Sequence, residues 1–512
     1  MRKSLFLRFQ RAQGLFLLYK RRRMRYDILG LVLNRKDIPM ERGTIKNAAQ
    51  EALLQHAAVE RIKIHLAGQH PSYHITTLGC QMNAHDSEKL AGILAEAGYI
   101  PSEREEDADL VVYNTCCVRE NAELKVYGRL GYLKGYKRKR PGMKIALCGC
   151  MMQEPHVVEK LKKSYPWVDL IFGTHNLYRF AELLEEILLE NRQVIDIWDK
   201  PGEIVEDLPS IRKTSFKASV NIMFGCNNFC TYCIVPYVRG RERSRKPEEI
   251  LKEVRELVAA GVKEIQLLGQ NVNSYGKTLE EPVSFAQLLY MVSEVEGVER
   301  IRFMTSHPKD LSDELIDAMK NCPKVCPHFH LPLQSGSDRL LKQMNRHYDK
   351  ARYLEIVRKL REAVPDIAIT TDIIVGFPGE TREDFLETLD VVRKAGFDNA
   401  FTFIYSKREG TPAARMENQV PPEESKANFE ELLAVLKEEI DRRNERLLGR
   451  TLMVMAEEVN QHDPSMLTGR SGENYLVHFH GDPSLIGQII PVRIDEQMTY
   501  YLTGTLQTDK EE

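Results

Sequence analysis

Short β-branched runs alternate with longer helical patterns over most of the 512-residue chain, and this alternation constrains the fold more than any other feature. It predicts βαβ units and parallel sheets, because a strand needs a crossover connection, usually a helix, before the next parallel strand can begin. A domain has roughly 100 to 200 residues, so a chain of this length should contain several. We therefore expect a multidomain α/β protein.

The first block of alternation covers residues 71–198 and predicts a domain built on a parallel βαβ sheet. Its candidate strands are residues 73–78, 109–113, 144–147 and 168–172. Residues 86–97 carry apolar side chains at helical spacing between the first two of these strands. Residues 1–70 show no sustained period, apart from a candidate helix at 45–65, and form an N-terminal extension without an assigned role.

A polar, proline-containing linker at 199–214 leads into a second block, over residues 215–447. Its candidate strands are residues 220–224, 264–268, 301–304, 325–331, 369–375 and 400–405. Six strands predict a partial (β/α)6 barrel, since a complete barrel would need two further βα units. A long charged helical pattern at 421–448 follows in their place.

The last segment, residues 448–510, has a different character. Its short candidate strands are residues 451–456, 475–479, 489–494 and 500–504, separated by Gly, Pro, Asn and Asp. Short strands with such turns predict a small antiparallel β-barrel.

The strongest chemical motif is a C-x3-C-x2-C run formed by Cys226, Cys230 and Cys233, just beyond the first strand of the second block. We refer to these three residues as the barrel cysteines. Three thiolates on one loop can hold three irons of a [4Fe-4S] cluster and leave the fourth iron open to a small molecule. The alternative is a zinc knuckle on Cys230 and Cys233, but zinc would need a second ligand pair and none lies nearby in the sequence.

A second set consists of Cys80, Cys116 and Cys150, each of which closely follows a different candidate strand of the first block. We call these the N-terminal cysteines. Ligands bind beyond the carboxyl ends of parallel strands, so the three thiols should converge there. The alternative is three unrelated structural thiols. Cys117 and Cys148 lie beside members of this set, whereas Cys322 and Cys326 match no ligand motif and are expected to be buried structural thiols.

Each of the N-terminal cysteines belongs to a short motif: Gly79-Cys80-Gln81-Met82-Asn83, Asn114-Thr115-Cys116 and Gly149-Cys150-Met151. With the barrel cysteines and the C-terminal β segment, they resemble the methylthiotransferase family of radical S-adenosylmethionine (SAM) enzymes over about residues 73–507. The resemblance implies that the barrel cysteines hold a SAM-binding [4Fe-4S] cluster, that the N-terminal cysteines hold a second [4Fe-4S] cluster, and that the neighbouring Cys117 and Cys148 are not ligands. It also implies a radical SAM domain at 215–447 and, at 448–510, a TRAM-like RNA-binding barrel.

The family divides by substrate, and Gly79-Cys80-Gln81-Met82-Asn83 resembles the branch that acts on tRNA containing N6-dimethylallyladenosine. That resemblance implies methylthiolation of carbon 2 of this adenosine at tRNA position 37, with separate proteins as electron donor and sulfur donor. The alternatives are N6-threonylcarbamoyladenosine in tRNA, an aspartate of a ribosomal protein, or a non-catalytic RNA-binding iron-sulfur protein.

Two loops of the second block are candidates for binding SAM. Gly269, Gln270 and Asn271 follow one candidate strand, and Gly376 and Glu380 follow another. Glycine at such a place lets the backbone approach a ligand closely, although it equally forms an ordinary turn. Their position beyond strand ends favours the ligand.

The net charge of −2 gives no argument for a nucleic-acid partner, so any such argument depends on local basic patches. One run directly follows the barrel cysteines and consists of Arg239, Arg241, Arg243, Arg245 and Lys246. A second covers residues 129–144. These runs are candidate RNA contacts, with a solvated surface as the alternative.

The chain has no run of the roughly 18 apolar residues that a membrane span needs, so we expect no membrane partner. The closely grouped cysteines favour metal binding in a reducing compartment over disulfides, which points to the cytoplasm. Residues 1–25 are basic and contain no Asp or Glu, so a mitochondrial targeting segment is the alternative.

Overall fold

The computed structural model describes residues 48–117, 120–190 and 192–507, and the expectation for residues 1–25 therefore lies outside it. The chain divides after Ile211 into two compact units, which we call the N-terminal unit and the C-terminal unit. The division falls inside the segment expected to be a linker. Each unit is an α/β structure with parallel strands, as the alternation in the sequence predicts.

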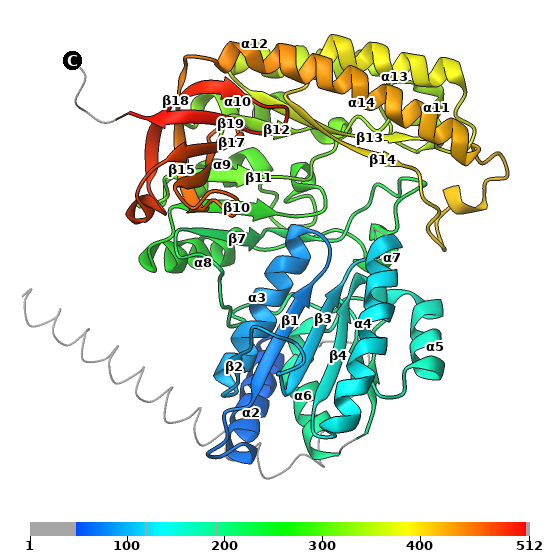
Figure 1. The fold of residues 1–512 in the computed structure, drawn as a ribbon, viewed down its shortest axis with the longest axis vertical. Coiled ribbons are helices and arrows are strands. Elements are labelled where there is room, and N and C mark those ends of the chain that lie inside the picture. Colours follow the sequence, from blue (N-terminus) through cyan, green and yellow to red (C-terminus); the bar gives the residue numbers. More distant parts are fainter. Residues whose placement is uncertain (1–47, 118–119, 191, 508–512) are drawn as a thin grey trace, which may run out of the picture. The chain divides into compact units, whose positions relative to one another are not determined.

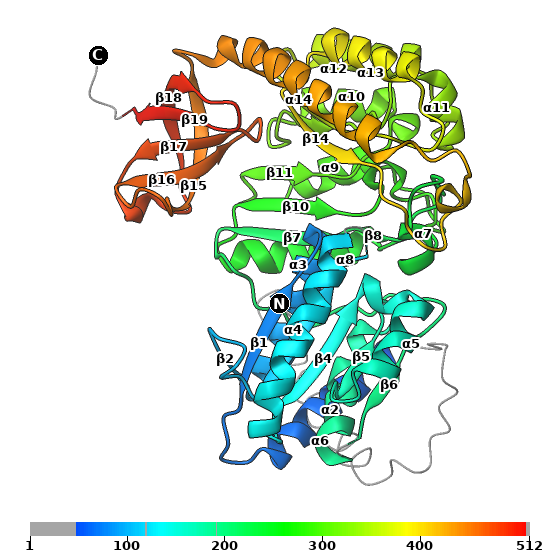
Figure 2. The same ribbon diagram turned by 45° about the vertical axis from the view of Figure 1, so that its right-hand side comes forward.

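The N-terminal unit contains one six-stranded sheet in the order β2-β1-β3-β4-β5-β6, and all its neighbouring strands are parallel. Figure 1 labels β1 to β4 of this sheet, and Figure 2 labels β5 and β6. The strands are β1 (Ser72–Thr77), β2 (Ile100–Pro101), β3 (Leu110–Thr115), β4 (Lys144–Gly149), β5 (Leu170–Phe172) and β6 (Val194–Asp196). The four predicted strands are present, and short edge strands β2 and β6 are added. β1 lies between the sheet positions of β2 and β3, so the strand order reverses direction beside β1 and β3.

Helices alternate with these strands along the chain. They are α2 (Ala48–His65), α3 (Gln81–Glu96), α4 (Glu120–Lys139), α5 (Pro155–Ser164) and α6 (Phe180–Leu189), with the short 3-10 helices η1 (Cys150–Gln153) and η2 (Leu177–Arg179). β3 and β4 are buried along their whole length, as expected for central strands of a parallel sheet.

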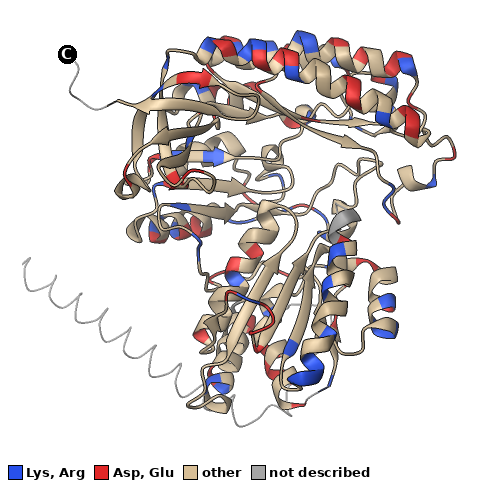
Figure 3. Ribbon diagram, in the orientation of Figure 1, with Lys and Arg blue, Asp and Glu red and all other residues tan. Residues whose placement is uncertain are grey.

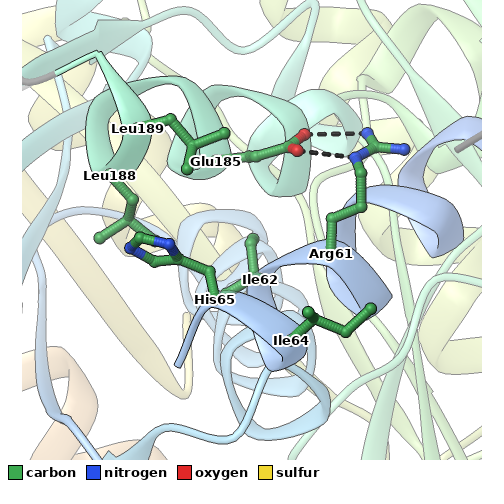
Figure 4. Close-up of a pocket in the computed structure, with 7 residues that line it drawn as sticks. All are labelled: Arg61, Ile62, Ile64, His65, Glu185, Leu188 and Leu189. Atoms are coloured by element: carbon green, nitrogen blue, oxygen red, sulfur yellow. Dashed lines mark hydrogen bonds and ion pairs between the residues drawn. The ribbon is translucent and has the colours of Figure 1, made fainter. Parts of the chain in front are cut away.

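Helix α2, which the sequence left without a role, belongs to the core of the N-terminal unit. Its Ala58, Val59 and Ile62 pack into the same apolar cluster as α6. Arg61 of α2 also donates two hydrogen bonds to the buried Glu185 of α6, at 2.6 and 2.8 Å (Figure 4). A buried carboxylate requires such a partner, so this pair fixes how the two helices pack.

The C-terminal unit begins with a partial barrel of six parallel strands in two sheets, β11-β10-β7 and β12-β13-β14. A parallel bridge between Ile301 and Val325 links the two sheets. The strands are β7 (Lys217–Asn221), β10 (Glu264–Leu268), β11 (Arg300–Phe303), β12 (His328–His330), β13 (Ala368–Val375) and β14 (Asn399–Ile404). The predicted strand at 220–224 is divided in two, because β8 (Met223–Phe224) pairs separately with β9 (Arg243–Ser244).

The helices of this barrel are α7 (Val235–Val238), α8 (Pro247–Ala259), α9 (Phe285–Ser293), α10 (Asp313–Asn321), α11 (Asp338–Gln343), α12 (Lys350–Ala363), α13 (Arg382–Ala395) and α14 (Pro422–Asn444). All except α7 and α11 share one large apolar core with the strands, including the fully buried Ile265, Leu267 and Phe329. The 3-10 helices of this segment are η3 (Val272–Ser274), η4 (Pro308–Asp310), η5 (Ala413–Arg415) and η6 (Glu445–Leu447), and η7 (Pro483–Leu485) belongs to the closed barrel that follows.

A closed five-stranded barrel, which we call the C-terminal barrel, ends the chain beside β10 and β11 (Figure 2). Its strands are β15 (Thr451–Val459), β16 (Met466–Ser471), β17 (Leu476–His480), β18 (Ile489–Gln497) and β19 (Leu502–Leu506). Arg300 and Arg302 of β11 donate hydrogen bonds to four of its backbone carbonyls, at 2.6–3.1 Å. These bonds anchor the C-terminal barrel to the amino-terminal half of the partial barrel.

None of the helices in residues 48–117, 120–190 and 192–507 combines the length and the apolarity needed to cross a membrane.

Two glycines on helices of the N-terminal unit should respond oppositely to replacement by alanine. A Cβ at Gly92 of α3 would lie 2.4 Å from the backbone of Pro209, whereas a Cβ at Gly131 of α4 would meet nothing within 4 Å. Gly131→Ala should therefore raise the free energy of unfolding by about 1 kcal/mol, the difference in helix propensity. Gly92→Ala should lower it, because the segment crossing α3 must move. Urea unfolding of both variants tests this; equal effects would contradict the packing described.

Candidate functional site

The N-terminal cysteines meet at one edge of the N-terminal sheet. Cys80 follows β1 as the N-cap of α3, Cys116 follows β3 directly, and Cys150 follows β4 as the first residue of η1. The strand order places β1 beside β3 and β3 beside β4. Parallel neighbours end at the same edge, and the reversal of strand order beside β1 and β3 opens a crevice there. The convergence expected from the sequence is present.

Asn83 ties this edge together from the first turn of α3. Its Oδ1 lies 3.8 Å from the sulfur atoms of both Cys80 and Cys150. Its Nδ2 donates hydrogen bonds to the carbonyls of Leu78 and Thr115, each at 3.0 Å. One buried side chain therefore contacts two of the three thiols and the backbone beside the third.

Glycine before two of these cysteines makes the close approach sterically possible. Gly79 has φ +125°, and a Cβ there would lie 2.6 Å from the Cβ of Cys116. Gly149 has φ +96°, and a Cβ there would lie 2.3 Å from the carbonyl oxygen of Thr115. A side chain at either position would push the strand ends apart, since φ in this range also disfavours any other residue.

Two further cysteines lie near this edge and differ in their surroundings. Cys148 is fully buried in the apolar core of the N-terminal unit. Cys117 is hydrogen-bonded to Cys150, and this bond together with burial raises the pKa of Cys117 well above the usual thiol range. The side chain of Cys117 therefore lies at the site, and its exclusion as a ligand remains a prediction.

The barrel cysteines lie on a loop between β8 and α7, beyond the first strand of the partial barrel. The amide of Cys226 donates to the carbonyl of Gly240 at 3.1 Å, and the amide of Cys233 donates to the carbonyl of Cys230 at 2.9 Å. Asn345 donates from Nδ2 to two loop carbonyls, those of Asn228 and Phe229, both at 3.1 Å. The loop is thus held from its own turn and from the segment after α11.

Arg346 supplies a buried positive charge to this loop. Its Nη1 donates to the sulfur of Cys230 at 3.3 Å, and its other nitrogens are held by the carbonyl of Pro332 and the hydroxyl of Tyr348. The guanidinium therefore places a positive charge directly against the sulfur of Cys230.

The chemistry of the barrel cysteines fits an iron-sulfur cluster. Burial raises the pKa of Cys226 to about 11 and, with the neighbouring Cys230, the pKa of Cys233 to about 12. Thiols at such depth give up their protons to a cation, so cluster binding would release protons and stabilise the loop. In the described part of the chain, no three His, Cys, Asp or Glu side chains are grouped to hold a single metal ion, whereas in a four-iron cluster each thiolate binds a different iron.

Polar side chains without partners lie beyond β7 and β10, on the same end of the barrel as this loop. Asn221 and Asn273 are buried, and within the described part of the chain neither atom of either amide has a hydrogen-bond partner. Asn271 donates to Asp310 at 2.8 Å, but no described residue donates to its buried Oδ1. Buried polar atoms are normally satisfied, so these amides fit a polar ligand such as SAM.

The residues expected to bind SAM have additional protein neighbours. A Cβ at Gly269 would lie 2.5 Å from the side chain of Met223, and a Cβ at Gly376 would lie 2.4 Å from the Oγ of Ser425. Gln270 accepts a hydrogen bond from the Gly225 amide, next to the cysteine loop. The close approach at both glycines is therefore to other parts of the chain.

Only some side chains of the basic run after the cysteine loop are exposed at the surface. Arg245 is buried and donates to the Asn221 carbonyl at 2.6 Å and to Glu253 at 2.7 Å, and Arg239 is also buried. Neither of these two candidate RNA contacts lies on a solvated face, because Arg239 caps the end of α7 and Arg245 lies between β9 and α8, where both are buried. Arg243 is partly buried beside Phe224, while Arg241 and Lys246 reach the surface.

Most of the second basic run lies on α4, which ends in the consecutive Lys137, Arg138 and Lys139 (Figure 3). Arg129 pairs with Glu105, and Lys137 pairs with Asp169. Acidic neighbours therefore neutralise part of this run.

Three sequence families match successive parts of the chain. Residues 72–173 match a family described as uncharacterized protein family UPF0004, residues 220–392 match the radical SAM superfamily, and residues 445–506 match the TRAM domain. A radical SAM methyltransferase from Kitasatospora setae, TsrM, shares the fold with a TM-score of 0.50 and 14% identity, over 68% of this chain and 77% of that one. The fold and the cysteine loop thus define a radical SAM enzyme.

Relatives named tRNA-2-methylthio-N(6)-dimethylallyladenosine synthase match nearly the full described length. The protein of Lachnoclostridium phytofermentans is 60% identical over 86% of this chain and 97% of its own. That of Clostridioides difficile is 58% identical over 84% of this chain and 90% of its own. The chain belongs to the family of tRNA-2-methylthio-N(6)-dimethylallyladenosine synthases, a branch of the radical SAM methylthiotransferases.

Two residues at the sites had no predicted role. Asn83 belongs to the motif Gly79-Cys80-Gln81-Met82-Asn83. It lies three residues after Cys80 and therefore on the same side of α3, and this spacing is the sequence feature that could have predicted its contact with the site. Arg346 lies 116 residues from Cys230 and no local pattern marks it.

Glu380 should make stability depend on pH. Burial raises its pKa to about 7, against 4.5 when unperturbed. A carboxyl whose folded pKa is raised stabilises the fold fully below the unfolded pKa, and this contribution is lost as pH rises through the folded value. Between about pH 5 and 8, the stability of the wild type relative to Glu380→Gln should fall by about 2 kcal/mol. Urea unfolding at several pH values measures this, and a flat difference would contradict it. The exposed Glu430→Gln is the matched control.

Proposed function

We propose that this chain transfers a methylthio group to carbon 2 of N6-dimethylallyladenosine at position 37 of tRNA, next to the anticodon. The observation that carries the proposal is the meeting of three thiols at one edge of the N-terminal sheet, in a chain that also has the barrel cysteines. A second cluster site is what a sulfur-inserting radical SAM enzyme needs beyond its SAM-binding site. The names of relatives at 60% and 58% identity support the nucleoside.

The proposal gives each segment a task. Residues 71–198 would hold one [4Fe-4S] cluster on Cys80, Cys116 and Cys150, and residues 215–447 would hold the other on Cys226, Cys230 and Cys233. Residues 448–510 would bind RNA as a TRAM-like barrel, joined by Arg241 and Lys246. When bound, the clusters and SAM would supply electron transfer and a sulfur donor. Radical chemistry is appropriate because the adenine C2–H is too weakly acidic for a side-chain base.

The chain's own residues position these groups. Arg346 donates a hydrogen bond to the sulfur of Cys230. The amides of Asn221 and Asn273 and the Oδ1 atom of Asn271 would orient the polar groups of SAM. Asn83 holds the strand ends together beside the other cluster site. Separate proteins would deliver the electrons and the replacement sulfur.

Iron content tests the two sites independently. The reconstituted wild type should hold about eight irons per chain, and replacement of either cysteine set by alanine should leave about four. Cys148→Ala, in the apolar core, is the matched control and should keep about eight. A wild type with about four irons would remove the second cluster from the proposal.

The same samples, given SAM, dithionite and tRNA bearing N6-dimethylallyladenosine, identify the reaction. Only wild type and Cys148→Ala should yield the methylthio nucleoside, read by mass after digestion. SAM cleavage without that product would point to another methylthiotransferase substrate, N6-threonylcarbamoyladenosine or a ribosomal-protein aspartate. RNA binding without SAM cleavage would indicate a non-catalytic iron-sulfur protein.

Asn83→Ala should lower the iron content without removing a ligand. It breaks the hydrogen bonds to Leu78 and Thr115 and the contacts with Cys80 and Cys150, so the N-terminal site should lose order. We expect iron to fall from about eight toward about four per chain, and stability to fall by about 1–3 kcal/mol. Asn321→Ala, at the exposed end of α10, is the control. Full iron in Asn83→Ala would show that these contacts do not organise the site.

A further inference from the structure

The C-terminal unit has a cavity of about 190 Å³ between the partial barrel and the C-terminal barrel. One wall comes from the first residues of β13 and β14, including Thr370 and Phe401. The other comes from the turn between β16 and β17 and from residues 498–502. The cysteine loop and Gly376 lie beyond the opposite, carboxyl ends of the barrel strands. The cavity is therefore separate from the candidate catalytic site.

Aromatic side chains from both barrels are exposed at this cavity. Tyr500, between β18 and β19, is 70% exposed, and Phe401, on the edge strand β14, is 48% exposed. His330 packs edge-on against Phe401, with ring centroids 6.0 Å apart, and His478 packs against Tyr501 at 4.7 Å. Large apolar rings gathered at a concave surface indicate a contact with a ligand.

A buried polar atom at the cavity is left unsatisfied by the described residues. Asn444, the last residue of α14, is 4% exposed and lines the cavity, and its buried Oδ1 accepts no hydrogen bond from any residue in 48–117, 120–190 or 192–507. A buried carbonyl oxygen of this kind requires an N–H or O–H donor. The occupant should therefore offer a flat ring to the aromatic residues and a donor to Asn444.

The size and composition of the cavity select one kind of occupant. A cavity of about 150 Å³ is known to hold one benzene, so this one is the size of a single flat ring system. Arg470 of β16 adds a cation to the wall and Glu473 adds a carboxylate, while the carboxylate of Asp398 is paired with Arg446. Single-stranded RNA is recognised by stacking of splayed-out bases on aromatic residues and by hydrogen bonds to base edges. The C-terminal barrel, moreover, matches the TRAM domain.

We propose that this cavity binds one unpaired base of the RNA substrate, at a subsite distinct from that of the reacting adenosine. The inference rests on the proposed function, since the RNA would be the same tRNA. Such a subsite would fix the register of the anticodon loop on the enzyme, so that one nucleotide reaches the catalytic end of the barrel.

The test uses the reconstituted holoenzyme and an anticodon stem-loop RNA with 2-aminopurine at one loop position at a time. One position should change in fluorescence with the wild type and not with Tyr500→Leu or Phe401→Leu. Each of these variants should bind RNA at least about five-fold more weakly, the loss expected for one stacked base. The slope of log Kd against log salt should stay unchanged, because no phosphate contact is lost.

Two controls separate stacking from a general loss of structure. Tyr500→Phe keeps the ring and should bind RNA like the wild type, and Tyr290→Leu removes an exposed aromatic ring on α9 and should have no effect.

An abasic nucleotide at the responding position should weaken binding to the wild type but not to Tyr500→Leu, which shows that base and ring act together.

Three results would overturn the inference: wild-type affinity in both leucine variants, no responding base, or a loss of affinity accompanied by a smaller salt slope. The last would indicate a phosphate contact. A wild type that shows the base signal and the coupled loss, but does not methylthiolate the tRNA, would instead remove the proposed function and leave the subsite in place.

Discussion

Parallel strands that lie side by side end at the same edge of a sheet, and the candidate chemistry of this protein depends on that constraint. In the N-terminal unit it brings together Cys80, Cys116 and Cys150, which are separated by 36 and 34 residues in the chain. In the C-terminal unit it brings the segments after β7, β10 and β13 to one end of the partial barrel. Loops carry the chemical groups, and the buried strands fix where those loops begin.

Close packing at the strand ends turns this general arrangement into particular sites. A Cβ at Gly79 or at Gly149 would clash with residues at the end of β3. Asn83 donates hydrogen bonds to two backbone carbonyls while it contacts two thiols. In the barrel, Arg346 brings a charge to Cys230 from a distant segment. Each of these residues acts on a thiol through geometry or charge, so each is a positioning residue and not itself a ligand.

The sequence predicts most of the fold because strands buried on both faces leave clear apolar runs. All four candidate strands of the first block and all six of the second correspond to strands, with ends shifted by a few residues. β2 and β6 have two and three residues and lie at sheet edges, and so leave little pattern. The sequence of β16, which contains Gly469 and Arg470, does not show a strand pattern. Its pairing with β15 and β17 makes it a strand.

The candidate sites are predictable only as far as local spacing reaches. The six cysteines could be found because each follows a strand end or lies in a compact run. The burial of Arg239 and Arg245 could not be predicted, because a run of basic residues has the same sequence pattern whether its side chains are exposed or buried. Long-range partners such as Arg346 and Asn444 carry no local mark, and only the folded chain shows what they face.

Anomalous diffraction at the iron edge from crystals of the reconstituted protein tests the central claim most directly. The account predicts two separate iron peaks, one bonded to Cys80, Cys116 and Cys150 and the other bonded to Cys226, Cys230 and Cys233. A single peak at the barrel cysteines would contradict it. So would a second peak bonded to Cys117 or Cys148, because the ligand set assigned to the N-terminal sheet would then be wrong.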